Sequence, residues 1–152
     1  MVYTSTLHNV CMNSKVIGNI GEAITIAEFV RRGIPVYTSF GENERADLIA
    51  EFNGKLNKIQ CKTSERFEDN VIVWRLTSST STGVHVYDKS EIDYFSLYNI
   101  ESKILLLVPV EIINGRKSIN VPIPYRKTNQ NTPLNYEDYL YDTVLDNIRF
   151  DS

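Results

Sequence analysis

The spacing of apolar residues near the start of the chain predicts an amphipathic helix over residues 14–32. Apolar side chains recur there at intervals of three and four residues, the spacing that places them on one face of a helix. These side chains are Ile17, Ile20, Ile24 and Ala27. Ser14 is the expected N-cap, and Gly33 is the expected residue just past the end of the helix.

Shorter apolar runs further along the chain predict strands. The expected strands are residues 34–40, 46–52, 56–62, 71–76, 84–87, 104–108 and 118–123. Pro35 favours an edge position for the first of them. Two more helices are expected at residues 90–98 and 136–148, and the Ser/Thr tract at residues 77–82 is expected to be an exposed loop. This order of elements predicts a mixed α/β core.

The dipeptide Asn53-Gly54 predicts a tight hairpin between the second and third strands. A two-residue turn at this point makes the numbers of paired residues sum to about 107, which places Asp47 opposite Gln60. Lys62 is two residues past Gln60 and therefore points to the same face. One face of the hairpin thus gathers an acid, an amide and a lysine. The alternative is an exposed face with a simple Asp–Lys contact.

The opposite face of the hairpin is expected to be a core surface. On it Leu48 faces Ile59 and Ala46 faces Cys61, all of them apolar or weakly polar. This separation of a packed face from a polar face predicts a site on the polar one.

Glu22 is the one carboxylate of the first helix that is expected to face this site. Its neighbours on the helix surface are Gly18, Ile26 and Phe29. A charge among apolar and small residues requires a partner. Gly18 and Gly21 would allow the helix to approach the sheet closely and bring Glu22 toward the hairpin. A structural salt bridge to Lys62 is the alternative.

Composition narrows the metal chemistry and the location. The two cysteines and two histidines do not form a zinc-binding set of the usual spacing, so any metal is expected to be held by oxygen ligands, as Mg²⁺ or Mn²⁺ are. The longest apolar run, residues 104–110, is too short to span a bilayer, and no secretion signal opens the chain. A cytoplasmic protein without membrane contact is therefore expected.

Charge is distributed unevenly, although the net charge is only −3. Residues 103–134 are basic, with Lys103, Arg116, Lys117, Arg126 and Lys127 against Glu111 alone. Residues 135–152 are acidic, with Arg149 as their one base. This asymmetry is compatible with nucleic-acid binding on one face, and also with an ordinary solvated surface.

Three short motifs together resemble the PD-(D/E)XK nuclease superfamily. They are Gly18-Asn-Ile-Gly-Glu22, Ala46-Asp47-Leu48 and Ile59-Gln60-Cys61-Lys62. The likeness spans residues 15–110 and is closest to intron-encoded homing endonucleases, among them enzymes of group I introns, in which glutamine replaces the second acid. Residues 93–99 and 107–109 resemble the helix and strand that follow the motif. Ala46 stands in place of the nominal proline.

The resemblance implies a restriction-endonuclease-like α/β fold, with a central mixed β-sheet flanked by helices. It also implies that Glu22, Asp47, Gln60 and Lys62 are catalytic. Mg²⁺, or Mn²⁺, would be bound by Glu22, Asp47, Gln60 and the backbone carbonyl of Cys61, while Lys62 would hold the nucleophilic water. The implied activity is site-specific cleavage of double-stranded DNA by a prokaryotic or phage-encoded enzyme. The alternatives are a Holliday-junction resolvase, a restriction-type nuclease and a catalytically silent DNA-binding protein of the same fold.

We expect one nuclease domain over residues 1–152, with a core at 14–110 and an extension at 111–152 for DNA contact or oligomerisation. The expected phosphate contacts are Lys15, Arg66, Arg75, Lys89, Arg116 and Lys117, and the expected base-reading segment contains Arg126, Lys127, Asn129 and Gln130. The segment is alternatively a polar surface loop. Arg75 and residues 78–82 are a further hypothesis for a groove-entering hairpin. Cutting two strands with one site per chain favours a homodimer or homotetramer. Its interface would use Tyr94, Tyr98, Tyr136, Tyr139 and Leu140, unless these are core residues.

Overall fold

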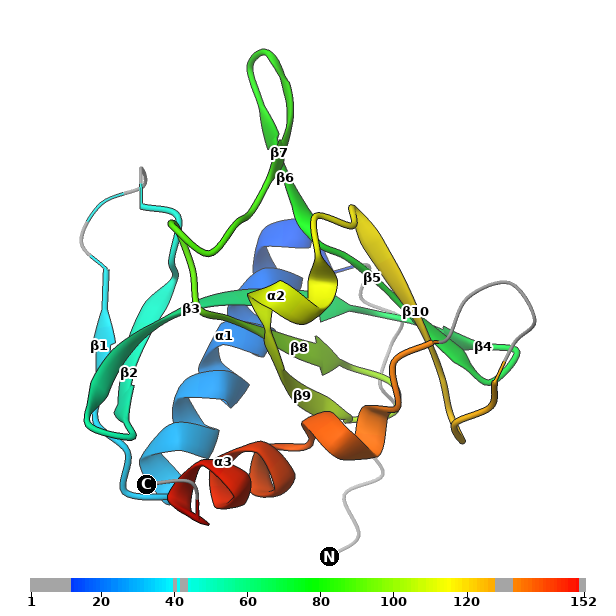
Figure 1. Cartoon of the computed structure of the whole chain (residues 1–152). Coiled ribbons are helices and arrows are strands. Elements are labelled where there is room, and N and C mark those ends of the chain that lie inside the picture. The colour runs from blue at the N-terminus through cyan, green and yellow to red at the C-terminus, as the bar shows by residue number, and fades with distance from the viewer. Residues whose placement is uncertain (1–11, 40, 42–43, 128–132, 151–152) are drawn as a thin grey trace, which may run out of the picture.

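The computed structural model describes residues 12–39, 41, 44–127 and 133–150. For residues 149 and 150 only the backbone is described. Figure 1 shows the arrangement of the elements in space. The helices are α1 (Ser14–Arg31), α2 (Val110–Ile113), the 3₁₀ turn η1 (Tyr136–Tyr139) and α3 (Tyr141–Phe150). The strands are β1 (Val36–Thr38), β2 (Leu48–Phe52), β3 (Lys55–Ser64), β4 (Phe67–Glu68), β5 (Val71–Arg75), β6 (Thr77–Thr80), β7 (Gly83–Val86), β8 (Tyr94–Asn99), β9 (Leu105–Pro109) and β10 (Ser118–Pro122).

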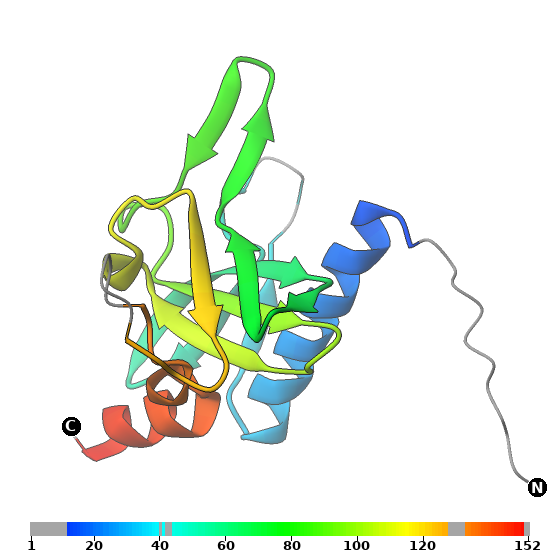
Figure 2. The same cartoon turned by 90° about the vertical axis from the view of Figure 1, so that its right-hand side faces the viewer.

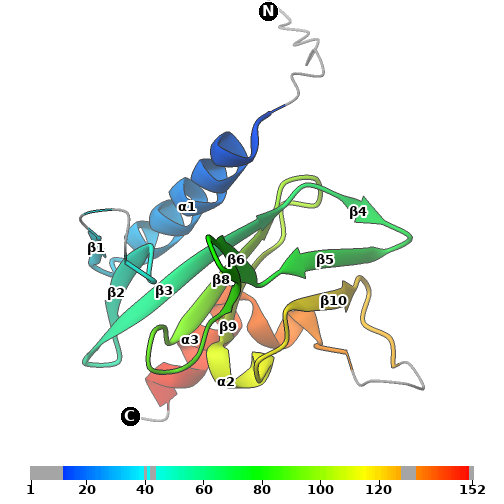
Figure 3. The same ribbon diagram turned by 90° about the horizontal axis from the view of Figure 1, so that it is seen from above.

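A five-stranded mixed sheet in the order β1-β2-β3-β8-β9 forms the centre of the molecule. Only β3 and β8 run parallel; the other neighbours are antiparallel. Helices α1 and α3 share one buried cluster with this sheet, built around Phe29, Ile59 and Tyr141. The smaller sheet β10-β5-β4 covers the other face through a second cluster that includes Trp74 and Phe95. The expected α/β fold with a mixed central sheet is therefore confirmed, and Figure 3 shows the layers from above.

The β2–β3 hairpin has the register that its turn predicts. Phe52 pairs with Lys55 and Leu48 with Ile59, and the turn residues Asn53 and Gly54 have φ of 56° and 65°. Positive φ at both positions is the signature of a type I′ turn, which suits the twist of the flanking strands. The strand at the edge of the sheet is β1, as the proline before it predicts.

The register departs from the prediction just before β2. The Asp47 amide donates to the Ile59 carbonyl (2.9 Å), so Asp47 does not continue the ladder opposite Gln60. The expected pairing of Ala46 with Cys61 on one core face is wrong for the same reason. Ala46 packs against the cluster beneath the smaller sheet, whereas Cys61 packs against the cluster beneath α1.

The buried face of α1 also differs from the prediction. The fully buried positions are Gly21, Thr25 and Phe29, while Ile24 remains 37% exposed. The helix follows this narrower stripe because it rests on β3 and β8, where Thr25 meets a serine of β8. The N-cap is Asn13 rather than Ser14: its Oδ1 accepts from the Val16 amide at 2.9 Å.

Residues 90–98 are not a helix, and residues 93–99 do not match the expected family helix. Residues 94–99 form the central strand β8, which is almost continuously buried. A strand covered on both faces loses the alternation of polar and apolar residues that marks a half-exposed strand. Its aromatic side chains Tyr94, Phe95 and Tyr98 suit a strand better than a helix.

Two further segments differ from the prediction. The Ser/Thr tract is not a loop: residues 77–80 form β6, which pairs with β7 in a separate two-stranded hairpin that projects from the body (Figure 2). The expected helix at 136–148 is divided at Leu140 into η1 and α3. Among the described residues, no helix has both the length and the apolar character needed to cross a bilayer.

Candidate active site

Asp47 is a half-buried carboxylate held in place by the neighbouring strand. It lies just before β2, and its Oδ2 accepts from the Cys61 amide at 2.7 Å. Burial raises the pKa of Asp47 to about 6, the hydrogen bond from Cys61 opposes this rise, and the nearby Glu22 carboxylate adds to it. A carboxylate in such surroundings is stabilised by a bound cation.

Glu22 reaches the site because α1 approaches β3 very closely at the preceding residue. A Cβ atom at Gly21 would lie 1.9 Å from Thr63 Oγ1, so only glycine fits without a shift. Glu22 is half-buried and acts electrostatically on Asp47. The expected convergence of Glu22 and Asp47 is therefore present, and Gly21 rather than Gly18 produces it, since a Cβ at Gly18 would meet nothing within 4 Å.

Gln60 is 8% exposed and lies beside the carbonyl of the next residue. Its Nε2 donates to the Cys61 carbonyl at 3.3 Å. The side-chain amide and this carbonyl together provide two neutral oxygens within reach of one another. Neutral oxygens of this kind are common ligands of hard cations.

Lys62 follows on the same strand, and its ammonium contacts Thr77 and Tyr87. Its Nζ donates to the Thr77 carbonyl at 2.9 Å and lies 5.2 Å from the centre of the Tyr87 ring. Burial lowers the pKa of Lys62, the Asp47 carboxylate opposes this, and the Arg75 guanidinium adds to the lowering. Within the described residues Glu22 and Lys62 form no salt bridge, so the alternative of a purely structural ion pair between them finds no support.

The donor set suits a hard divalent cation. Among the described residues, no three His, Cys, Asp or Glu side chains lie together in an arrangement that could hold a metal ion. The site offers two carboxylates, an amide and a backbone carbonyl instead, all of them oxygen donors. A bound cation would also offset the negative charge of the half-buried Asp47 carboxylate. Oxygen donors of this mixture fit Mg²⁺ or Mn²⁺.

A model of the PD-(D/E)XK endonuclease family matches residues 12–142, most of the chain. The chain belongs to this family. The structure is similar to that of a bacterial homing endonuclease, I-Ssp6803I, with a TM-score of 0.67 and 20% sequence identity over 90% of this chain and 95% of the other. A comparison with curated protein sequences finds no match. PD-(D/E)XK endonucleases act with divalent metals, in keeping with the oxygen donors of this site.

The sequence motifs predict Asp47 as the acid and Lys62 as the lysine of the PD-(D/E)XK motif, with alanine in place of the first proline and glutamine in place of the second acid. The amide at Gln60 removes one negative charge from a site where Asp47 and Glu22 already repel each other. Glu22 on α1 is a second carboxylate close enough to act electrostatically on Asp47.

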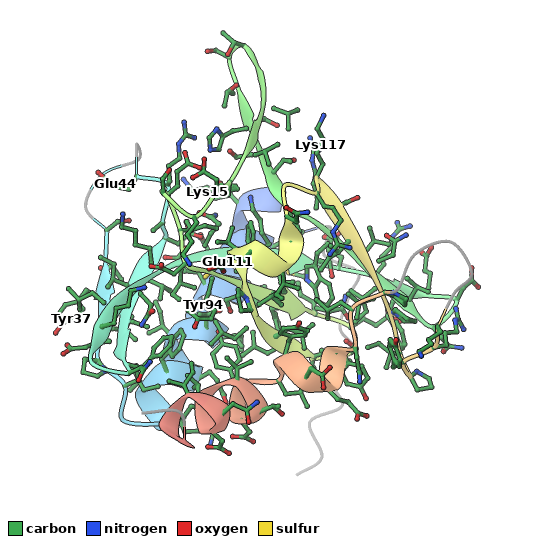
Figure 4. The ribbon with its side chains drawn as sticks, viewed as in Figure 1. Lys15, Tyr37, Glu44, Tyr94, Glu111 and Lys117 are labelled. Atoms are coloured by element: carbon green, nitrogen blue, oxygen red, sulfur yellow. The ribbon has the colours of Figure 1, made fainter. Side chains whose placement is uncertain are left out.

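The expected DNA-contact residues are found in different surroundings. Lys15 and Lys117 are exposed near the end of the endonuclease from which the β6–β7 hairpin projects (Figure 4). Lys89 is paired with Glu111, and Arg66 with Glu68 at 3.3 Å. The remaining expected contacts are Arg75, Arg116, Arg126, Lys127, Asn129 and Gln130.

Arg75 and Arg116 have structural partners. Arg75 Nε donates to Thr77 Oγ1 at 3.1 Å, close to Lys62. Arg116 donates to the carbonyls of Ile112 and Ile113, so it caps the end of α2. Arg126 and Lys127 are exposed, whereas Asn129 and Gln130 lie outside the described residues.

A buried chain of hydrogen-bonded hydroxyl groups, which the sequence did not predict, lies next to Gly21 on α1. Thr25 Oγ1 donates to the Gly21 carbonyl (2.8 Å) and lies 2.7 Å from Ser96 Oγ, which lies 2.6 Å from Tyr141 Oη. The chain links α1, β8 and α3. It could not be predicted because its three members are far apart in sequence and Ser96 was assigned to a helix.

The tyrosines proposed for an oligomer interface are largely core residues. Tyr98 is 8% exposed, and the Tyr94 ring packs at a tilt against Phe52, with 5.6 Å between the ring centroids. Tyr136 and Tyr139 pack against the cluster beneath the smaller sheet. Of the two readings of these side chains, the structure supports the core one.

Proposed function

We propose that this endonuclease, encoded by a prokaryote or by a phage, is a metal-dependent, site-specific enzyme of the prokaryotic cytoplasm that hydrolyses phosphodiester bonds of double-stranded DNA. One observation carries the proposal: a half-buried Asp47, with its pKa raised to about 6, is close enough to the Glu22 carboxylate and to Lys62 for both to act on it electrostatically. Isolated buried charges are costly, so an arrangement of this kind needs a function to retain it.

Asp47, Glu22, the Gln60 amide oxygen and the Cys61 carbonyl are the residues that would hold Mg²⁺ or Mn²⁺. Coordination by Gln60 requires its amide to turn its oxygen toward the metal, because the nitrogen now faces the Cys61 carbonyl. When bound, the cation supplies Lewis acidity and lowers the pKa of a water ligand. The Cys61 amide keeps Asp47 Oδ2 in place and leaves its other oxygen for this role.

Lys62 is the group that would act on the reacting phosphate. Its ammonium can hold the attacking water or offset the negative charge that develops on the phosphate oxygens. The Thr77 carbonyl and the Tyr87 ring limit where its Nζ can lie. Such preorganisation is what a positioned charge needs to stabilise a transition state.

One site per chain cuts one strand, so a double-strand break favours a symmetric homodimer or homotetramer. The exposed cations proposed to contact DNA are Lys15, Lys117, Arg126 and Lys127. The other proposed cations, Arg66, Arg75, Lys89 and Arg116, have protein partners and would have to exchange these partners for phosphate oxygens.

The preferred DNA substrate distinguishes the proposed function from the other functions possible on this fold. Pure protein is incubated with supercoiled plasmid, linear duplex carrying random sequence and a four-way junction, in Mg²⁺ or in chelator. Metal-dependent cutting of duplex at preferred sequences supports a homing or restriction type of endonuclease. Preference for the junction would instead indicate a resolvase. Tight duplex binding without cutting in any metal would contradict the proposal and indicate a silent DNA-binding protein.

A further inference from the structure

The β6–β7 hairpin stands apart from both larger sheets. Its strands pair from Thr77 opposite Val86 to Thr80 opposite Gly83, and they pair with no other strand. In Figures 1 and 2 it projects from the body as a narrow ribbon. Four residues of extended strand reach about 13 Å. The major groove of DNA is roughly 8.5 Å deep and wide enough for a two-stranded ribbon.

The outer part of this ribbon carries hydroxyl groups and no charge. Ser79, Thr80, Ser81 and Thr82 are all exposed, and Val84 is 49% exposed. Hydroxyls can donate to or accept from base edges, and an apolar side chain can contact the methyl group of thymine. Hydroxyls also contact phosphate oxygens, but a ribbon whose outer part carries no cationic side chain lacks the groups that hold the phosphate backbone most strongly. Its hydroxyls and its valine therefore suit contact with base edges in the groove.

The base of the ribbon is fixed beside the catalytic lysine. Thr77, the first residue of β6, accepts the hydrogen bond from Lys62 through its carbonyl. Tyr87, directly after β7, lies under the same ammonium and packs edge-on against Phe95 at 5.7 Å. Both ends of the ribbon are thus buried in the wall of the active site, and Thr77 and Tyr87 are each 6% exposed.

This placement connects base reading to the position of the cut. Lys62 must lie at the phosphate that is hydrolysed, so the ribbon, which starts at its Nζ, enters the groove next to that phosphate. Lys15 and Lys117 lie near the same end of the molecule, where they can contact the flanking backbone (Figure 4).

We propose that the β6–β7 hairpin is the specificity-determining element of the enzyme, and that it reads base edges in the major groove within about half a helical turn of the scissile phosphate. This inference rests on the proposed endonuclease function.

The test compares the sequences that three proteins cut from a duplex library with a randomised segment: wild type, a triple variant and a control variant. The triple variant combines Ser79→Ala, Ser81→Ala and Thr82→Ala. Thr80 is kept because its Oγ1 donates to the Gly83 carbonyl and closes the turn. Thr38→Ala, which removes an exposed threonine of the edge strand β1, is the matched control. Circular dichroism and thermal unfolding verify that all three proteins are folded alike.

Wild type and the Thr38→Ala control are expected to show base preferences of about tenfold or more at a block of adjacent positions beside the cut. In the triple variant these preferences should fall below about twofold at that block, and remain elsewhere, while cleavage of the total library stays within about threefold. An unchanged preference profile would overturn the inference. So would a loss confined to positions more than one helical turn from the cut. Failure of the wild type to cut any member of the library would instead count against the proposed function itself.

Discussion

At the scale of single residues, the site holds carboxylates in partly buried positions, where neutral side chains would be more stable. Asp47 is buried enough to raise its pKa to about 6, although its carboxylate accepts a backbone hydrogen bond and lies near a lysine. Glu22 adds a second negative charge in the same region. The metal-free protein therefore carries an electrostatic cost at its active site, as functional sites commonly do.

The sign of this cost predicts how stability depends on pH. The pKa of Asp47 rises from an ordinary 3.8 to about 6 on folding, so between these values the folded state binds more protons than the unfolded state. The free energy of unfolding therefore falls as pH rises from about 4 to 6, by up to roughly 3 kcal/mol from this group. Asp47→Asn removes the charge and keeps an acceptor for the Cys61 amide.

We expect the metal-free Asp47→Asn variant to be more stable than wild type by about 1–3 kcal/mol at pH 8, with the difference vanishing near pH 4. Urea unfolding at several pH values, in chelator, measures it. Glu51→Gln, which changes an exposed acid of β2, is the control and should show no such trend. Equal stabilities of wild type and Asp47→Asn at pH 8 would mean that Asp47 carries no burial cost.

At the scale of elements, the close approach of α1 to β3 brings Glu22 to the site. Gly21 leaves no room for a side chain against Thr63, whose Oγ1 is buried without a hydrogen-bond partner. Gly18, one turn earlier on the same helix, faces open space. The two glycines thus offer a comparison between a crowded and an open position.

Gly21→Ala is expected to destabilise the protein by about 1–3 kcal/mol, because the added methyl group must displace Thr63 or shift the helix. Gly18→Ala should be neutral or stabilising by up to about 1 kcal/mol, as alanine is the better helix former. Combining Gly21→Ala with Thr63→Ala should recover part of the loss. Thermal and denaturant unfolding give these values. Equal effects of the two single substitutions would show that α1 is not held close to β3 at Gly21.

The elements that could be predicted from the sequence are those specified by local chemistry. The Asn53-Gly54 turn defines the β2–β3 register, and Gly33, with φ of 72°, ends α1 as expected. β8 escaped prediction because burial on both faces removes its alternation. The buried face of α1 was also predicted wrongly, because it depends on the contact between Thr25 and Ser96, which is 71 residues away in the sequence.

At the scale of the whole molecule, the active site depends on contacts that no local pattern contains. Asp47, Gln60 and Lys62 come from one hairpin, so its turn predicts that they lie near one another, although Asp47 leaves the predicted register just before β2. The contact of Lys62 with Thr77 requires the β6–β7 hairpin to pack beside β3, and this in turn depends on the pairing of β5 with β10 more than 40 residues later. Long-range pairings of this kind lie beyond what turns and periodicity specify.

The arrangement of the whole molecule also determines which of its surfaces would contact DNA. The hairpin, Lys15 and Lys117 lie toward one end of the molecule (Figure 4), whereas α3 packs on the buried face of the central sheet through Tyr141. DNA approaching that end would meet the base-reading ribbon and the catalytic lysine together. This arrangement would bring base recognition and cleavage to the same end of the molecule.

The most direct test of the account is the single-turnover rate of DNA cleavage, measured in Mg²⁺ and in chelator for wild type, Lys62→Ala and Lys58→Ala. Lys58 is an exposed lysine on the same strand and serves as the matched control. We expect metal-dependent cleavage by wild type and Lys58→Ala at similar rates, and a loss of about 100-fold or more for a folded Lys62→Ala. Cleavage that persists in chelator, or equal rates for the two lysine variants, would contradict it.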